Sequence, residues 1–156
     1  MGRIYSAQFN NVAVTAAQDL FEVNCPADSV VKILHVSLGQ TTDVGDAEDE
    51  NLRVLLIRGA TTSGSGGTTP TAAPLQFGSP AYGGTVECNN TTAATGGTPV
   101  TLHAEVFNVR AGYVYTPTPE CQIHLSPSQR FVVNLPGAPA DSLTMSGTII
   151  FEELGG

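Results

Sequence analysis

Apolar and polar residues alternate in short runs along most of this chain, and no stretch has the apolar spacing of an amphipathic helix. The clearest runs cover residues 30–38, 52–57 and 130–135, which are rich in Val, Ile, Leu and Phe. Branched and aromatic side chains suit a pleated, half-buried surface, because they are stiff and pack well across neighbouring strands. The pattern therefore predicts an all-β chain.

Clusters of Gly, Pro, Asn and Asp separate the runs and set the boundaries of the predicted strands. Alternation places Tyr5 and Phe9 on one face of the first strand, and Leu143 and Phe151 on one face of the last. A break in the alternation at Phe107 predicts a β-bulge or a change of edge there. The predicted strands cover residues 3–9 with a continuation over 12–15, then 20–24, 30–39, 52–58, 85–88, 100–110, 112–115, 121–125, 130–135 and 143–152.

This many antiparallel strands, with long loops and no fixed repeat, favour an antiparallel jelly-roll or Greek-key sandwich. An immunoglobulin-like sandwich is the second alternative, although the chain contains no Trp. The loops over 61–80 and 89–99 are long enough to predict a functional or mobile role. We predict a single β-sandwich domain over 1–156, with residues 1–15 as a candidate extended N-terminal arm, because that segment is low in charge.

The charge balance narrows the classes of partner. Hydrophobic residues make up 41% of the chain and charged residues only 13%, with 6 Lys and Arg against 14 Asp and Glu. The net charge of −8 repels phosphate groups, so we expect no direct nucleic-acid binding and no binding to an anionic membrane surface. The sequence shows neither a secretory signal nor a long apolar span, which predicts folding in a cytoplasm. The odd count of 3 cysteines then predicts reduced thiols.

The densest polar cluster of the sequence is the acidic run over 43–51. Carboxylate oxygens are the ligands that hard cations prefer, but the spacing is not that of an EF-hand. Three interpretations stay open: a solvated loop between two strands, an ion site, or a docking contact for Arg3, Arg53 or Arg58 of a neighbouring copy. The candidate metal ligands are Asp43, Asp46, Glu48, Asp49 and Glu50.

No other motif predicts a catalytic or cofactor site. His35, His103 and His124 are far apart and lack the local spacing of zinc ligands. The chain has no nucleophile elbow of the G-x-S-x-G type and no complete phosphate-binding loop. Glu105 and Glu120 are the only suggestion of a glycosidase pair, and nothing beyond their presence supports it. We therefore expect no enzyme activity and no cofactor.

Along its whole length the chain resembles a family of small proteins encoded in tailed-bacteriophage and prophage genomes. The matching stretches belong to framework and loops and form no catalytic signature. They are residues 2–5, 11–22, 58–67, 89–93, 108–113 and 138–144.

The resemblance implies a structural virion protein, and a capsid decoration or cement protein in particular. It implies assembly in the host cytoplasm, a position on the capsid exterior, the major capsid protein as partner, and a homotrimer. An alternative is a receptor- or carbohydrate-binding β-domain of a tail or head fibre, in which Tyr82, Tyr113 and Tyr115 would stack on sugars. Contacts are expected from the N-terminal segment and the loop over 60–80. The candidate interaction residues are Arg3, Ile4, Tyr5, Phe9 and Val12.

Overall fold

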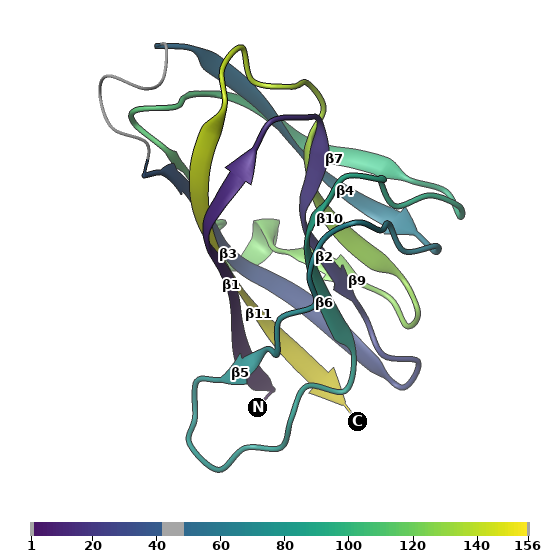
Figure 1. Cartoon of the computed structure of the whole chain (residues 1–156). Helices are drawn as coiled ribbons and strands as arrows, with labels where there is room; N and C mark the ends of the chain where they lie inside the picture. The colour runs from purple at the N-terminus through teal and green to yellow at the C-terminus, as the bar shows by residue number, and fades with distance from the viewer. Residues whose placement is uncertain (1, 42–48, 156) are drawn as a thin grey trace.

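The computed structural model describes residues 2–41 and 49–155, and it is an all-β sandwich of two antiparallel sheets (Figure 1). One sheet has the order β5-β1-β11-β3-β8, with β9 also paired to β3, and the other has the order β6-β2-β10-β4-β7. The strands are β1 (Arg3–Val14), β2 (Gln18–Asn24), β3 (Ser29–Gln40), β4 (Asn51–Ala60), β5 (Ala73–Pro74), β6 (Thr85–Asn90), β7 (Val100–Asn108), β8 (Tyr113–Tyr115), β9 (Ile123–Leu125), β10 (Arg130–Leu135) and β11 (Leu143–Gly155). A short 3₁₀ helix, η1 (Pro119–Cys121), precedes β9.

The strand order is that of a jelly roll. Without β5 and β6, the two sheets read β1-β11-β3-β8 and β2-β10-β4-β7, so the chain changes sheet between β1 and β2, between β2 and β3 and at most later connections. This confirms the predicted jelly-roll sandwich and excludes the immunoglobulin-like alternative. The described residues contain no helix that is long and apolar enough to span a membrane.

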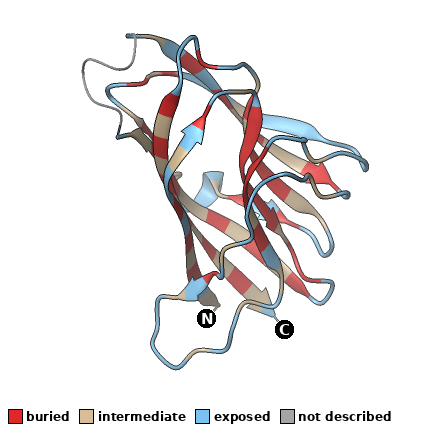
Figure 2. Cartoon of the chain, in the orientation of Figure 1, coloured by how far each residue is buried: buried red, intermediate tan, exposed pale blue. Residues whose placement is uncertain are grey.

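The core lies between the two sheets and takes alternate side chains from each long strand (Figure 2). Tyr5 and Phe9 point inward from β1, and Leu143 and Phe151 do so from β11, as the alternation predicts. Gly147 lies opposite Phe9 in the sheet, and a Cβ there would come within 2.7 Å of the Phe9 ring. The absence of a side chain at this position therefore makes room for Phe9.

The N-terminal residues do not form an extended arm. They form β1, which pairs with β11 from Arg3 to Val14 and with β5 at Tyr5 and Ser6. The register shifts between Phe9 and Val12, where Asn11 has a φ of 51°. The two predicted strand pieces are thus one strand with a bulge, because Asn tolerates the left-handed conformation that a bulge needs. The bulge predicted at Phe107 is wrong, since the register of β7 shifts between Thr101 and His103.

The connection from β4 to β7 is an excursion across the outer face of the β2-containing sheet. It crosses to the opposite edge, forms β5 and β6 there, and returns. The outward segment (61–69) and the return segment (91–98) hydrogen-bond to each other, with Thr62 paired to Thr95 and Ser65 paired to Thr92. We call these two segments the strap. The long loops of the sequence are therefore a hydrogen-bonded ribbon.

The cysteines give a direct check of the packing. Cys25 and Cys88 are buried, and burial raises the pKa of Cys25 and raises that of Cys88 to about 12. Cys121 is exposed. We expect all three thiols to react with a thiol reagent in denaturant without prior reduction, and at most one, Cys121, in the native protein, because buried thiols form few thiolates. Mass spectrometry after labelling measures both counts, and rapid native labelling of Cys25 or Cys88 would contradict the packing.

Candidate functional site

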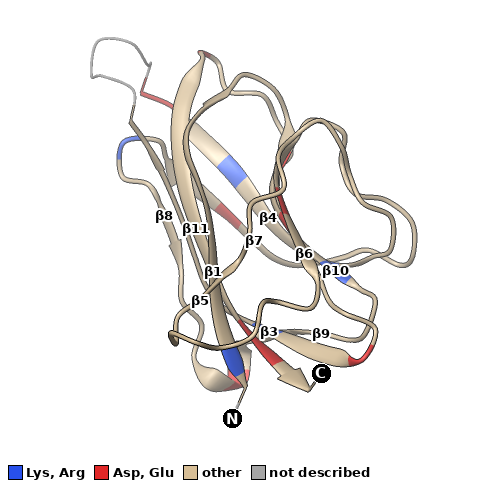
Figure 3. Cartoon of the chain, turned by 60° about the horizontal axis from the view of Figure 1, so that its bottom comes forward, with Lys and Arg blue, Asp and Glu red and all other residues tan. Residues whose placement is uncertain are grey.

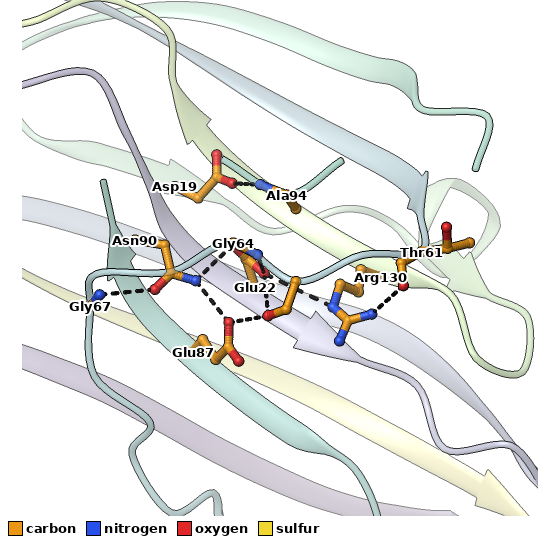
Figure 4. A network of polar contacts seen from close by, with 10 residues as sticks. Asp19, Glu22, Thr61, Gly64, Gly67, Glu87, Asn90, Ala94 and Arg130 are labelled. Atoms are coloured by element: carbon orange, nitrogen blue, oxygen red, sulfur yellow. Dashed lines mark hydrogen bonds and ion pairs between the residues drawn. The ribbon is translucent and has the colours of Figure 1, made fainter. Parts of the chain in front are cut away.

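A network of polar side chains lies on the outer face of the β2-containing sheet, beneath the strap (Figure 4). Glu22 is only 2% exposed, although its neighbours along β2 point into the core. The backbone N–H of Gly64 donates to both Glu22 carboxylate oxygens, at 3.2 and 3.1 Å. Asn90 donates to the same carboxylate at 2.7 Å. Ser63 and Asn90 also donate to the carboxylate of Glu87, so they bridge the two acids.

Two further contacts attach the strap to the sheet. The Asn90 side-chain oxygen accepts from the N–H of Gly67 at 3.1 Å. Arg130 lies with its Nε 4.0 Å from Glu22 and donates from its other guanidinium nitrogen to the carbonyl of Thr61 at 2.9 Å. The outward segment is therefore held along its length by groups of β2, β6 and β10.

Asp19 holds the return segment in the same way. One of its oxygens accepts from the N–H of Ala94 at 2.7 Å, and the other accepts from the Asn134 side chain at 2.6 Å. A buried hydrogen bond of 2.9 Å, from the Gln18 side chain to the Asn89 side chain, also joins β2 to β6. Each buried acid thus binds backbone N–H groups that would otherwise lack a partner inside the protein.

This cluster is built to hold loops. The N–H groups of Gly64 and Ala94 point at the carboxylates from the strap, and the Asn90 side chain does so from β6, so the oxygens are already occupied by hydrogen bonds from the same chain. Among residues 2–41 and 49–155, no group of three or more His, Cys, Asp or Glu side chains is arranged to hold a metal ion. The cost of burying a polar group is offset when its hydrogen bonds are satisfied, so the arrangement serves to fix the strap.

Burial also raises the pKa of Asp19 and of Glu22, although their hydrogen bonds oppose the shift. Their folded pKa values therefore lie above the unfolded values of about 4. Between the unfolded and the folded pKa values, the folded state binds more protons than the unfolded state. These groups therefore add to the unfolding free energy as the pH falls through that range, and this contribution is lost as the pH rises above the folded pKa values.

We expect the melting temperature of the protein to increase as the pH is lowered through the raised pKa values of these two acids toward the unfolded value of about 4. The slope should be smaller in Asp19→Asn, because that variant lacks one of the two buried acids. Asp141→Asn is the matched control, since Asp141 is exposed. Calorimetry at several pH values measures the slope, and an unchanged slope in Asp19→Asn would show that this carboxyl does not titrate as described.

A second feature is an open cleft of about 560 Å³ at the edge formed by β7, β8 and β9. Its apolar wall includes Leu102, Tyr115 and Ile123. His103 and His124 also line it, and the His103 ring lies 5.2 Å from the Tyr115 ring. The remaining lining residues are Arg58, Pro117, Glu120, Cys121 and Gln122. We call this the edge cleft.

The large apolar side chains that are exposed in the described part of the chain gather at the two opposite edges of the sandwich. At the β5 edge, Phe77 has 103% of the exposure of a free residue. At the β7 edge, most of β7 is exposed, although it is a strand (Figure 2). The exposed set is Ile4, Leu75 and Phe77 at the β5 edge, and Val100, Leu102, Val106 and Val114 at the β7 edge.

Only part of the predicted acidic site, residues 43–51, lies among the described residues. Asp43, Asp46 and Glu48 lie outside the described residues. Asp49 accepts a hydrogen bond from Asn108 at 2.6 Å, and Glu50 accepts from the N–H of Ala140 at 3.1 and 2.9 Å. These two acids therefore fasten neighbouring loops, and the prediction of an ion site stays open.

The predicted interaction residues divide by burial. Tyr5 and Phe9 are core residues, so their side chains are not available to a partner. Val12 is partly buried against the core. Arg3 pairs with Glu153 at 3.2 Å. Ile4 is the one large apolar side chain among the five that is exposed.

The tyrosines predicted to stack on sugars are not exposed platforms. Tyr113 is 2% exposed, and burial raises its pKa. Tyr82 packs with its ring 5.3 Å from Tyr5 and 4.8 Å from Phe151, and it donates to the carbonyl of Asn24 at 2.6 Å. The prediction of exposed aromatic side chains is therefore wrong for both. Tyr115 is half-buried in the edge cleft.

Neither a comparison with protein-family models nor one with curated protein sequences finds a match. Among solved structures, the chain is similar to viral capsid proteins, at low scores. A chain of the infectious bursal disease virus Gx strain has a TM-score of 0.21 and 11% identity, over 99% of this chain and 41% of that one. VP17, a capsid protein of bacteriophage P23-77, has a TM-score of 0.19 and 11% identity, over 94% and 96%. The chain spans about 40% of the length of the infectious bursal disease virus chains that it matches. At these scores the similarity carries no argument about function.

Proposed function

We propose that this protein is a structural component of a tailed-phage virion, and that it binds the outside of the head as a decoration protein. The observation that carries the proposal is the placement of the exposed apolar side chains at the two edges of a jelly roll. Contiguous apolar surface on a folded protein marks interaction sites. The sequence resemblance to small phage and prophage proteins gives the class of partner, which is the major capsid protein.

The electrostatic surface supports protein contacts of this kind. Lys and Arg are few, and residues 59–86 contain no charged side chain at all (Figure 3). An uncharged surface loses little hydration energy when it is covered by another protein. Ile4, which lies at the β5 edge, belongs to the proposed contact surface. We further propose that the assembly unit is a homotrimer, since closed symmetric oligomers cover the open edges of β-sheets.

The test is to add the purified protein to mature heads that lack it, and to count bound copies after sedimentation by quantitative gel analysis. Binding at hundreds of copies per particle is expected of a decoration protein. A handful of copies would place it on the tail or on a fibre, and no binding would overturn the proposal.

A further inference from the structure

Phe77 is presented to solvent by an ordered turn. The N–H of Leu75 donates to the carbonyl of Ile4 at 2.9 Å, and the N–H of Ser79 donates to the carbonyl of Gln76 at 3.2 Å. Gly78 has a φ of 84°, the left-handed conformation that the third position of a type II turn requires. Phe77 therefore occupies the corner of a closed turn, and the cost of ordering this segment is met when the protein folds.

The residues that follow this turn, Pro80 and Tyr82, are also held in place. The Tyr5 hydroxyl donates to the carbonyl of Pro80 at 3.0 Å, and Tyr82 packs against Tyr5 and Phe151. A rigid loop with an apolar tip binds at lower entropic cost than a flexible one. The β5 edge thus carries a preformed apolar projection, made of Ile4, Leu75 and Phe77.

The opposite edge offers a complementary depression. The edge cleft lies between β7 of one sheet and β8 and β9 of the other, and it is large enough for an aromatic side chain. β7 is an edge strand of nine residues with exposed Val100, Leu102 and Val106, a surface that invites contact with another chain. The projection and the cleft lie on opposite sides of the molecule (Figure 1).

Charge favours a second copy as the occupant. Two chains of net charge −8 repel each other wherever acidic surfaces meet. Leu75 and Phe77 of the projection belong to the uncharged segment 59–86, and the Asp, Glu, Lys and Arg residues that line the cleft are Arg58 and Glu120, which are opposite in sign. Contact between these two edges therefore brings no like-charged surfaces together.

We propose that copies of this chain associate head to tail, with Phe77 of one copy inserted into the edge cleft of the next. Such a contact covers the exposed apolar residues of both edges, whereas a two-fold contact through β7 alone would leave Ile4, Leu75 and Phe77 in water. A head-to-tail contact between opposite sides of the molecule adds copies in series, and it closes into a ring only when the rotation between copies allows it. The inference rests on the proposed self-association and supplies its interface, but it does not depend on binding to a phage head.

The experiment uses the free protein and two variants, each defective at one edge. Leu75→Ser combined with Phe77→Ser removes the projection, and Leu102→Glu places a charge in the cleft. These side chains are exposed, so both variants should keep the circular dichroism spectrum and melting temperature of the parent. Gln76→Ser, in the same turn, is the matched control. Mass is measured by size-exclusion chromatography with light scattering.

We expect the parent and Gln76→Ser to form oligomers with the mass of two or more chains, and each defective variant alone to be monomeric. An equimolar mixture of the two variants should give dimers with one copy of each, because only one intact projection and one intact cleft remain to meet. A monomeric parent protein, or a mixture that stays monomeric, would overturn the inference. So would variants that keep the mass of the parent.

Cys121 supplies a second readout, because its exposed thiol lines the cleft. Its labelling rate should be several-fold slower in the parent oligomer than in the variant without the projection. Equal rates would contradict insertion into the cleft. If the parent protein is monomeric and still decorates heads, the interface is wrong and the proposed function stands. If the parent protein forms the head-to-tail oligomer and does not bind heads, the interface stands and the proposed function is wrong.

Discussion

Deletion of residues 2–14 is expected to abolish folding. The deletion removes β1 from between β5 and β11 and removes the core side chains Tyr5, Phe9 and Val14. Burial of three such side chains contributes about 4.5–9 kcal/mol in total, at about 1.5–3 kcal/mol each. That sum is comparable to the whole stability of a typical domain, about 5–15 kcal/mol. The truncated protein should show no cooperative melting transition by circular dichroism.

A matched pair of substitutions in β1 separates core packing from strand pairing. Phe9→Ala keeps the strand and should lower the unfolding free energy by about 3–5 kcal/mol. Gln8→Ala, the exposed neighbour on the other face, should change it by less than about 0.5 kcal/mol. Chemical denaturation measures both.

A truncated protein that melts cooperatively, with an intact β spectrum, would mean that residues 2–14 are a dispensable arm after all.

Substitution of Glu22 is the second change with a large expected effect. Glu22→Ala removes the acceptor for the N–H of Gly64 and for the side chains of Ser63 and Asn90, and leaves those donors without it beneath the strap. Removal of one partner from a buried charged network costs about 3–5 kcal/mol. Denaturant titration should show a loss of that size. Hydrogen exchange should show faster exchange at Gly64 and Ser65 before global unfolding.

Two variants control for this result. Glu22→Gln keeps one acceptor oxygen and should cost less than Glu22→Ala. Glu120→Gln changes an exposed acid and should leave stability within about 0.5 kcal/mol of the parent. If Glu22→Ala costs no more than Glu120→Gln, the buried carboxylate does not hold the strap.

The strands were predictable because their signal is local. Alternation over 3–9 and 143–152 is enforced by one buried face, so the core positions of β1 and β11 follow from the sequence alone. The sequence does not distinguish a bulge at Asn11 from a turn, since Asn is common in both and the two differ only in whether pairing resumes with the same neighbour.

The polar cluster was not predictable in the same way. Glu22 occupies an outward position of an alternating strand, where an acid is normally solvated. Its burial depends on Gly64, which follows about forty residues later, and on the return segment beyond β6. A signal did exist in the sequence, because two Thr- and Gly-rich loops flank the strand that contains Glu87 and contain no charged residue themselves. Only tertiary pairing, however, converts that composition into a ribbon.

The pattern of apolar and polar residues does not predict that Phe77 is exposed either. A lone aromatic residue between Pro74 and Pro80 can fold back onto a core, as Tyr82 does a few residues later. Which of the two turns outward is decided by the turn at Gly78 and by the space beside Tyr5, both of which depend on β5 pairing with β1.

The strap has a mechanical consequence for any assembly in which neighbours pull on the two edges. Its outward segment leaves β4 just after Arg58, which lines the edge cleft, and reaches β5 just before the turn that carries Phe77. Tension between the two edges therefore passes along a covalent backbone that is clamped to β2 and β10 through Glu22 and Arg130. A subunit built in this way would resist stretching by shearing many hydrogen bonds together, and not by opening its core one strand at a time.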